Sequence, residues 1–89
     1  MPQISRFYGI TILMYYNEQL HQDLPHFHAR YSGRWASFGL EPFKLLAGEL
    51  PPRASALISE WAEGHKVELM ANWIRAQNHE PLAAVAPLS

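Results

Sequence analysis

A chain of 89 residues and 10.2 kDa is one small domain with a modest core, and its composition of 48% apolar and 17% charged residues excludes an intrinsically disordered protein. The lack of cysteine excludes disulfides and thiolate chemistry, and no stretch has the roughly 18–20 apolar residues of a membrane span or the apolar core of a secretory signal. A net charge of −1 argues against a protein that coats nucleic acid by charge alone. We expect one cytoplasmic domain over residues 1–89.

The first half of the chain, residues 1–50, is rich in strand-forming residues. Its first run, FYGITILMYY, combines β-branched and aromatic side chains, which suit a half-buried pleated surface. A polar stretch that ends in proline, residues 17–25, predicts a loop. Ser32-Gly33 predicts a two-residue hairpin turn, because glycine readily adopts the positive φ of such turns. We expect four strands: residues 7–16, 26–31, 35–40 and 43–47.

The second half, residues 51–78, predicts a helix. Pro51-Pro52 suits the first helical turn, where backbone N–H groups have no intrahelical partner. Apolar residues follow at helical spacing and include Trp61, which we expect in the core. Gly64 costs about 1 kcal/mol in a helix interior, so a kink or a break is expected there. The apolar tail, residues 79–89, is expected to dock on the domain as an edge strand or in a groove.

These elements share one core, which predicts an α+β, two-layer fold. We expect a small, mostly antiparallel sheet of three to four strands, packed on a C-terminal helix or a kinked helix pair. The two-residue turn places Phe27 opposite Phe38 on an apolar face, which should meet the helices. The other face carries three further pairs: His26–Gly39, His28–Ser37 and Arg30–Trp35.

The sheet face that the helices leave uncovered is the predicted binding surface. Its members are Leu13, Tyr15, His26, His28, Arg30 and Trp35. Apolar surface left in water forgoes about 25 cal/mol per Å² of burial, which a small domain recovers by self-association. We therefore expect a homodimer through this face. The alternative is that the tail, residues 82–88, folds over it and leaves a monomer.

His26 and His28 project from the same face of a strand and could share a metal or act as an acid–base pair. A metal site needs a third ligand, for which His21, Asp23 or His65 is available. No local spacing fixes any of these, and two surface histidines are the simpler interpretation. We therefore expect no bound metal and no cofactor.

Two further groups allow more than one interpretation. Arg30 beside Trp35 is either a structural surface pair or a cationic and aromatic platform that receives a nucleobase. His65, four residues after Trp61 on one helical face, is either a buried general base or a core histidine bonded to a backbone carbonyl. The structural interpretation is favoured in both cases.

Five separated segments of the chain together carry a family resemblance. They are FYGI, MYY, PHFHARY, GELPPR and EWAEGHKVELMANW, at residues 7–10, 14–16, 25–31, 48–53 and 60–73. In this order they resemble the small bacterial domain of unknown function 4160 (DUF4160) over nearly the whole chain. That family has no established activity, and its genes often lie beside the gene of another small domain, a pair proposed to be a toxin–antitoxin module. The loop over residues 17–25 is longer here than the loop of the family.

Two functions follow. The first is a non-catalytic interaction module that dimerises or binds a small partner protein from a neighbouring gene, as in a toxin–antitoxin pair. The alternative is a metal-independent ribonuclease toxin in which His28 is the general acid or base, Arg30 stabilises the phosphorane charge and His65 is a further catalytic candidate. The net charge favours the interaction module. We expect no membrane contact, and nucleic acid only under the alternative.

Overall fold

The computed structural model describes residues 3–15 and 24–89. The predicted loop over residues 17–25 therefore lies, up to residue 23, outside the described residues, and so do His21 and Asp23. None of the described helices is long and apolar enough to cross a membrane.

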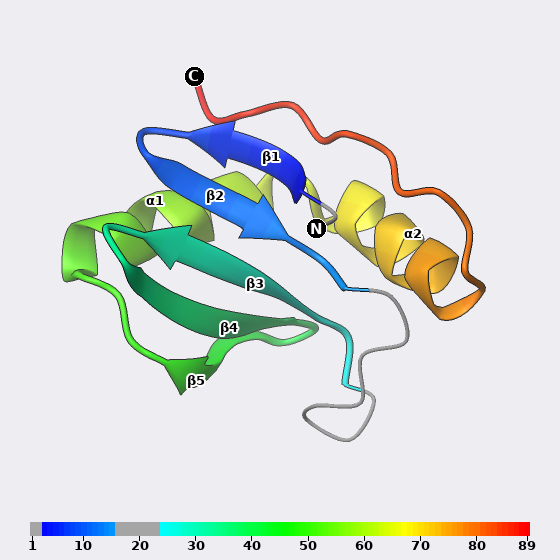
Figure 1. The fold of residues 1–89 in the computed structure, drawn as a ribbon, viewed down its shortest axis with the longest axis horizontal. Helices are drawn as coiled ribbons and strands as arrows, with labels where there is room; N and C mark the ends of the chain where they lie inside the picture. Colours follow the sequence, from blue (N-terminus) through cyan, green and yellow to red (C-terminus); the bar gives the residue numbers. More distant parts are fainter. Residues whose placement is uncertain (1–2, 16–23) are drawn as a thin grey trace.

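The strands form one antiparallel meander in which each strand pairs with the next along the chain (Figure 1). The strands are β1 (Gln3–Phe7), β2 (Ile10–Leu13), β3 (His26–Tyr31), β4 (Arg34–Leu40) and β5 (Phe43–Gly48). The α+β class and the antiparallel sheet are confirmed, with five strands in place of three to four.

The extra strand arises because the predicted strand over residues 7–16 is two strands. The chain turns at Tyr8 and Gly9, which have φ values of 50° and 79°. Two consecutive positive φ values are typical of the tight hairpin turns that match the twist of a sheet. The run of β-branched and aromatic residues concealed this turn, although Gly9 was its one signal in the sequence.

The hairpin of β3 and β4 has the predicted register. Ser32 and Gly33 form the turn with φ values of 49° and 77°, and Phe27 lies opposite Phe38. The three pairs expected on the other face are also present: His26–Gly39, His28–Ser37 and Arg30–Trp35. The alternation of apolar and polar residues across a two-residue turn was therefore sufficient to align these strands.

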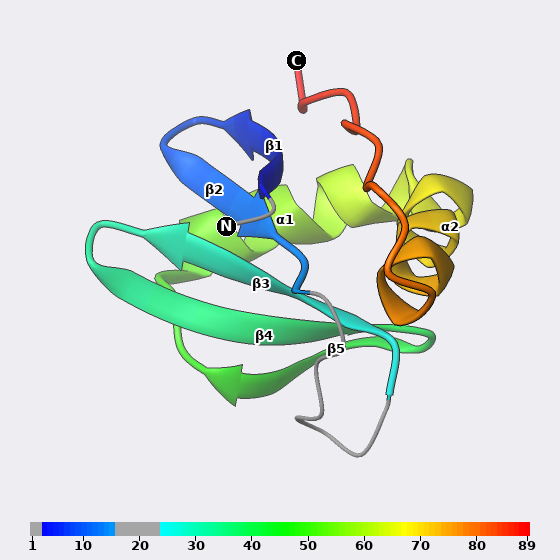
Figure 2. The same cartoon turned by 45° about the vertical axis from the view of Figure 1, so that its right-hand side comes forward.

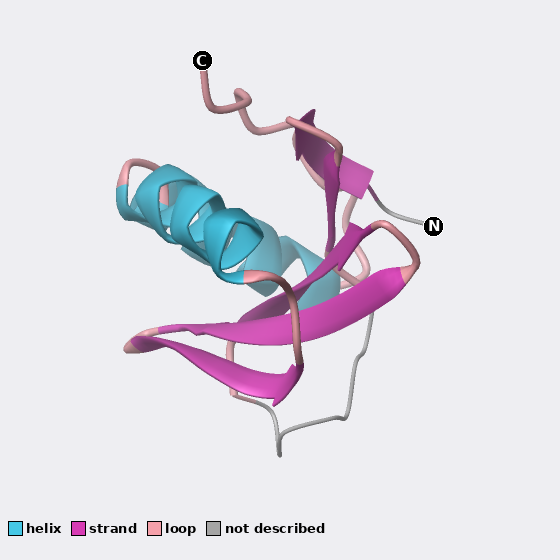
Figure 3. Cartoon of the chain, turned by 90° about the vertical axis from the view of Figure 1, so that its left-hand side faces the viewer, coloured by secondary structure: helices cyan, strands magenta, loops and turns pink. Residues whose placement is uncertain are grey.

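Two helices cover one face of the sheet (Figure 3). They are α1 (Pro52–Glu63) and α2 (Lys66–Gln77), so the predicted helix breaks at Gly64, which is the C-cap of α1. The first turn of α1 begins at Pro52, as the Pro51-Pro52 pair indicated. We call the helix-covered side of the sheet the inner face and the opposite side the outer face.

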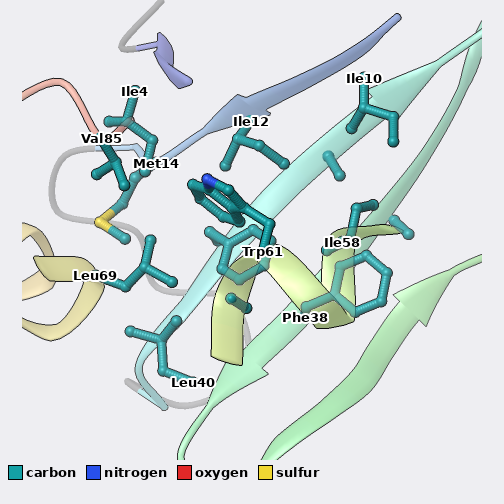
Figure 4. Packing of buried hydrophobic residues seen from close by; sticks show 14 of the residues in the cluster. Ile4, Ile10, Ile12, Met14, Phe38, Leu40, Ile58, Trp61, Leu69 and Val85 are labelled. Atoms are coloured by element: carbon teal, nitrogen blue, oxygen red, sulfur yellow. The ribbon is translucent and has the colours of Figure 1, made fainter. Parts of the chain in front are cut away.

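Trp61 of α1 lies at the centre of the core between the sheet and the helices (Figure 4). Only 1% of its surface is exposed, and its ring centroid lies 5.3 Å from that of Phe7 and 5.8 Å from that of Phe27. The expected position of Trp61 is confirmed. Ile12 of β2 and Met14, which directly follows that strand, lie in the same core.

The tail after α2 crosses the helix layer and reaches the free edge of β1 (Figure 2). The Val85 N–H donates to the Ile4 carbonyl at 2.8 Å, and the indole N–H of Trp61 donates to the Ala86 carbonyl at 2.8 Å. Val85 is buried in the core. The tail thus contacts β1 and α1, and these contacts do not place it on the outer face.

Candidate functional site

One row of side chains crosses the outer face from β1 to β4. Cross-strand pairing places Arg6 opposite Thr11, Thr11 opposite Arg30, and Arg30 opposite Trp35. Directly paired residues of an antiparallel sheet project to the same side, so each of these four side chains is next to the following one in space. Arg6, Arg30 and Trp35 are exposed, and Trp35 keeps 52% of its surface in solvent.

The row borders an open hollow of about 580 Å³ near the turn between β3 and β4. We call it the Arg–Trp hollow and define it by Gln3, Thr11, Arg30, Arg34 and Trp35. The buried Leu13 also lines it, as do Gly9, Tyr31 and the turn residues Ser32 and Gly33. Two arginines contribute to the wall, and no acidic side chain is among its described lining residues. In a chain with a net charge of −1, this hollow is a local site of positive charge beside an exposed indole.

The other end of the outer face is buried. Leu13 is 2% exposed, His28 is 8% exposed and His26 is 1% exposed. The expectation that Leu13 and the two histidines lie open on a polar surface is therefore wrong. We call this part of the outer face the histidine end.

Hydrogen bonds and ring contacts fix both histidines. Nδ1 of His28 lies 3.1 Å from the hydroxyl of Ser37, its predicted cross-strand partner. The rings of His28 and Tyr15 pack edge to face, with their centroids 4.7 Å apart. Nδ1–H of His26 donates to the Leu24 carbonyl at 2.6 Å. The His26 ring lies 5.2 Å from that of His28 and 5.1 Å from that of Trp73 in α2.

This burial could not be derived from strand alternation. Alternation decides which face a side chain takes, whereas the cover over that face comes from residues distant in the chain. Here the partly buried Tyr15 follows the end of β2 and packs over His28, and Trp73 of α2 reaches the start of β3. Nothing in the sequence of residues 26–28 indicates either contact.

His65 lies in the helix layer, at the start of α2. Its Nδ1–H donates to Oε1 of Glu68 at 2.7 Å, and its ring packs at 5.7 Å from that of Trp61. The expected contact with Trp61 is present, but the hydrogen-bond partner is a carboxylate one turn along the helix and not a backbone carbonyl. His65 is only partly buried, so neither a deeply buried base nor a fully enclosed core histidine describes it.

The described residues contain no group of three or more His, Asp or Glu side chains placed to hold a metal ion. Two of the three possible third ligands named from the sequence, His21 and Asp23, lie outside those residues. The third, His65, belongs to α2 and not to the outer face. The absence of a metal site remains a prediction.

Sequence reasoning missed a buried amide in α2. Asn72 is 0% exposed; its Oδ1 accepts from the Ala83 N–H and its Nδ2 donates to the Ala83 carbonyl, both at 2.8 Å. Arg75 donates to the same Oδ1 at 2.9 Å. Asn72 thus holds the tail as a neighbouring strand would. Sequence reasoning also missed Gln3 and Thr11 of the hollow, because the first hairpin was not recognised. It paired Arg34 with Tyr31 but did not single out Arg34 for a site.

The comparison with known families agrees with the resemblance carried by the segments above. The family model described as "Domain of unknown function (DUF4160)" matches residues 9–74. The chain belongs to this family. The match includes β2, β3, β4, β5 and α1 and ends within α2. The region that this DUF4160 domain shares with its family therefore contains His26 and His28 at one end of the outer face and Arg30 and Trp35 at the other. No curated protein and no solved structure matches the chain.

Proposed function

We propose that this DUF4160 chain is a non-catalytic interaction module that binds an acidic segment of a partner protein in the Arg–Trp hollow. The observation that carries the proposal is the composition of the hollow: Arg30 and Arg34 lie beside the exposed Trp35 without an acidic neighbour among its described lining residues. Arginine and tryptophan are the residue types that most often dominate the energy of protein interfaces.

Charge complementarity selects the kind of partner. A guanidinium group presents planar, paired donors that match a carboxylate, and an adjacent indole supplies apolar contact area at low entropic cost. A glutamate- or aspartate-bearing segment with one apolar side chain fits both. The family's gene arrangement makes the product of the adjacent gene the first partner to test, in keeping with a toxin–antitoxin pair.

The ribonuclease alternative relies on His28 as the acid or base. His28 is 8% exposed and is engaged with Ser37 and Tyr15, so little of its surface is accessible to a phosphodiester. Arg30 lies two residues away on the same strand face but in open solvent. This separation of the two groups by burial favours binding over catalysis.

A matched pair of charge reversals tests the binding site. The chain and the product of the adjacent gene are purified separately, and their affinity is measured by calorimetry for Arg30→Glu and for Arg53→Glu. Arg53 is exposed in the first turn of α1, in the helix layer, and is not among the residues that line the hollow. We expect Arg30→Glu to weaken binding at least tenfold and Arg53→Glu to leave it unchanged. Equal effects, or no binding by the unmodified chain, would contradict the proposal.

A growth experiment separates the module from the ribonuclease. The gene is expressed alone, with Arg30→Ala as the variant, since this change removes the guanidinium without touching the buried histidine end. The interaction module predicts no cleavage of single-stranded RNA by the purified chain. Growth arrest together with RNA cleavage, both lost in Arg30→Ala and in a folded His28→Ala, would establish the enzyme instead.

A further inference from the structure

Helix α2 carries a second exposed surface, which the proposed function does not use. Val67, Met70, Ala71 and Ile74 recur at positions i, i+3, i+4 and i+7, so they form one stripe along the helix. Val67 is 83% exposed and Ile74 is 54% exposed, while the two residues between them are partly buried. Helix α2 lies at the end of the molecule away from the turn between β3 and β4, which borders the Arg–Trp hollow (Figure 1).

The stripe borders a shallow groove of about 450 Å³. Its lining consists of the four stripe residues with Glu41 and Lys66. A valine and an isoleucine that are more than half exposed on a single helix face form an apolar patch of the kind that marks an interaction site. The buried side of α2, with Leu69 and Trp73, is already used by the core, so the stripe is the second apolar face of this helix.

We infer that the α2 stripe is a self-association surface, at which a second copy of this chain packs antiparallel about a two-fold axis between Met70 and Ala71. That axis places Val67 opposite Ile74 of the second copy and Met70 opposite Ala71. The large side chain thus meets the small one, as close helix packing requires. The same pairs form twice, once on each side of the axis.

The charges beside the stripe fit the same arrangement. Glu68 and Arg75 lie 100° and 80° around the helix from Val67, at 100° per residue, so they share one flank. In an antiparallel pair the same flanks of the two helices face each other. Glu68 then lies about two residues, or about 3 Å along the axis, from Arg75 of the second copy. Within the chain Glu68 already accepts a hydrogen bond from His65 and Arg75 already donates one to Asn72, so each pair across the axis adds to these contacts. Opposite charges meet twice, and this charge complementarity selects a second copy as the occupant.

The surface is short. The stripe runs over about two helical turns, so it buries less than the roughly 800 Å² per partner of a standard interface. The dissociation constant is therefore expected in the micromolar range. Sedimentation equilibrium from about 10 µM to about 1 mM covers this range. We expect reversible dimerisation that Val67→Glu weakens at least tenfold. Val67 is exposed, so this variant keeps its fold, as a circular dichroism melt would verify.

Trp35→Glu is the matched control, because it places the same charge at an exposed apolar residue of the outer face. A dimer weakened by Trp35→Glu and unaffected by Val67→Glu would overturn the inference and place the contact on the sheet, as the sequence alone suggested. A strict monomer over the whole concentration range would also overturn it. Binding at the Arg–Trp hollow is measured separately with Arg30→Glu, so either proposal can fail while the other stands.

The orientation has its own test, because the chain contains no cysteine. In the antiparallel pair the two copies of position 71 lie about 1.5 Å apart along the axis, and the two copies of position 67 about 10.5 Å apart. A disulfide requires Cα atoms within about 7 Å. We expect mild oxidation to link Ala71→Cys into a covalent dimer and to leave Val67→Cys monomeric. Equal linking of both variants, or linking of Val67→Cys alone, would overturn the arrangement.

Discussion

The two ends of the outer sheet face follow the same alternation of residues and lie in opposite environments. At the histidine end, Leu13 and His28 are almost fully buried. At the other end, Arg30 follows His28 by two residues on the same strand and the same face, yet Arg30 and its partner Trp35 are open to solvent. A single strand of this sheet therefore begins in the interior and ends at a surface suited to binding.

This difference shows what a strand pattern can and cannot encode. The period of two assigns each side chain to a face, and one face of a small sheet is expected to be solvated. Tyr15 and Trp73 change that outcome at one end only, since they pack against the histidine rings. Of the six residues expected on the outer face, Leu13, Tyr15, His26, His28, Arg30 and Trp35, only Arg30 and Trp35 are exposed.

The inner face lies beneath both ends of the outer face, and a substitution there should cause the largest loss of stability. Trp61→Ala should cost about 3–5 kcal/mol, because it opens a cavity among Phe7, Phe27 and Ile12 and removes the hydrogen bond to Ala86. Against a total stability of about 5–15 kcal/mol, the variant should be poorly soluble or partly unfolded. Denaturant unfolding measures this loss, and an unchanged midpoint would mean that Trp61 does not fill the core.

At the histidine end, Leu13→Ala should destabilise the chain by about 2–4 kcal/mol, as for other buried leucines. This value distinguishes the structure from the sequence-based expectation, under which Leu13 lies in solvent and the change costs less than about 0.5 kcal/mol. Chemical denaturation of the monomer is the measurement. A loss below about 0.5 kcal/mol would show that both ends of the outer face are open.

At the open end, Trp35→Ala should change the free energy of unfolding by no more than about 1 kcal/mol, although tryptophan is the largest side chain in the protein. Half of its surface is already in water, so little burial is lost. The same unfolding assay gives the value. A loss near that of Trp61→Ala would assign Trp35 to the core and remove the basis of the Arg–Trp hollow.

The smallest expected effect is that of metal. His26 and His28 are engaged with Leu24 and Ser37 through Nδ1, and the described residues add no third ligand. We expect the purified chain to carry no stoichiometric zinc or nickel after dialysis, and zinc to leave its melting temperature unchanged. One equivalent of metal by elemental analysis, lost in His28→Ala, would identify the histidine end as a metal centre.

Local chemistry accounts for the parts of the fold that could be predicted. The Ser32-Gly33 turn, the helix entry at Pro51-Pro52 and the break at Gly64 each depend on backbone preferences of the residues themselves. The turn at Tyr8 was missed because tyrosine has no preference for positive φ. The strand-forming residues around it therefore predicted one continuous strand.

The site was harder to predict than the fold, since it depends on contacts between distant segments. Arg30 and Trp35 were identified because they pair across a short turn. Gln3 and Thr11 were not, because they reach the hollow only through the unrecognised first hairpin. His65 was assigned to the core from helical spacing. In the structure it lies at the start of α2, where it forms an exposed hydrogen bond with Glu68.

Fluorescence quenching by acrylamide tests the division of the outer face most directly. The chain has three tryptophans, of which Trp35 is 52% exposed while Trp61 and Trp73 are 1% and 6% exposed. We expect one readily quenched component, absent in Trp35→Phe and shielded when the product of the adjacent gene is bound. A quenched component that persists in Trp35→Phe would show that Trp61 or Trp73 is open to solvent, and would contradict the account.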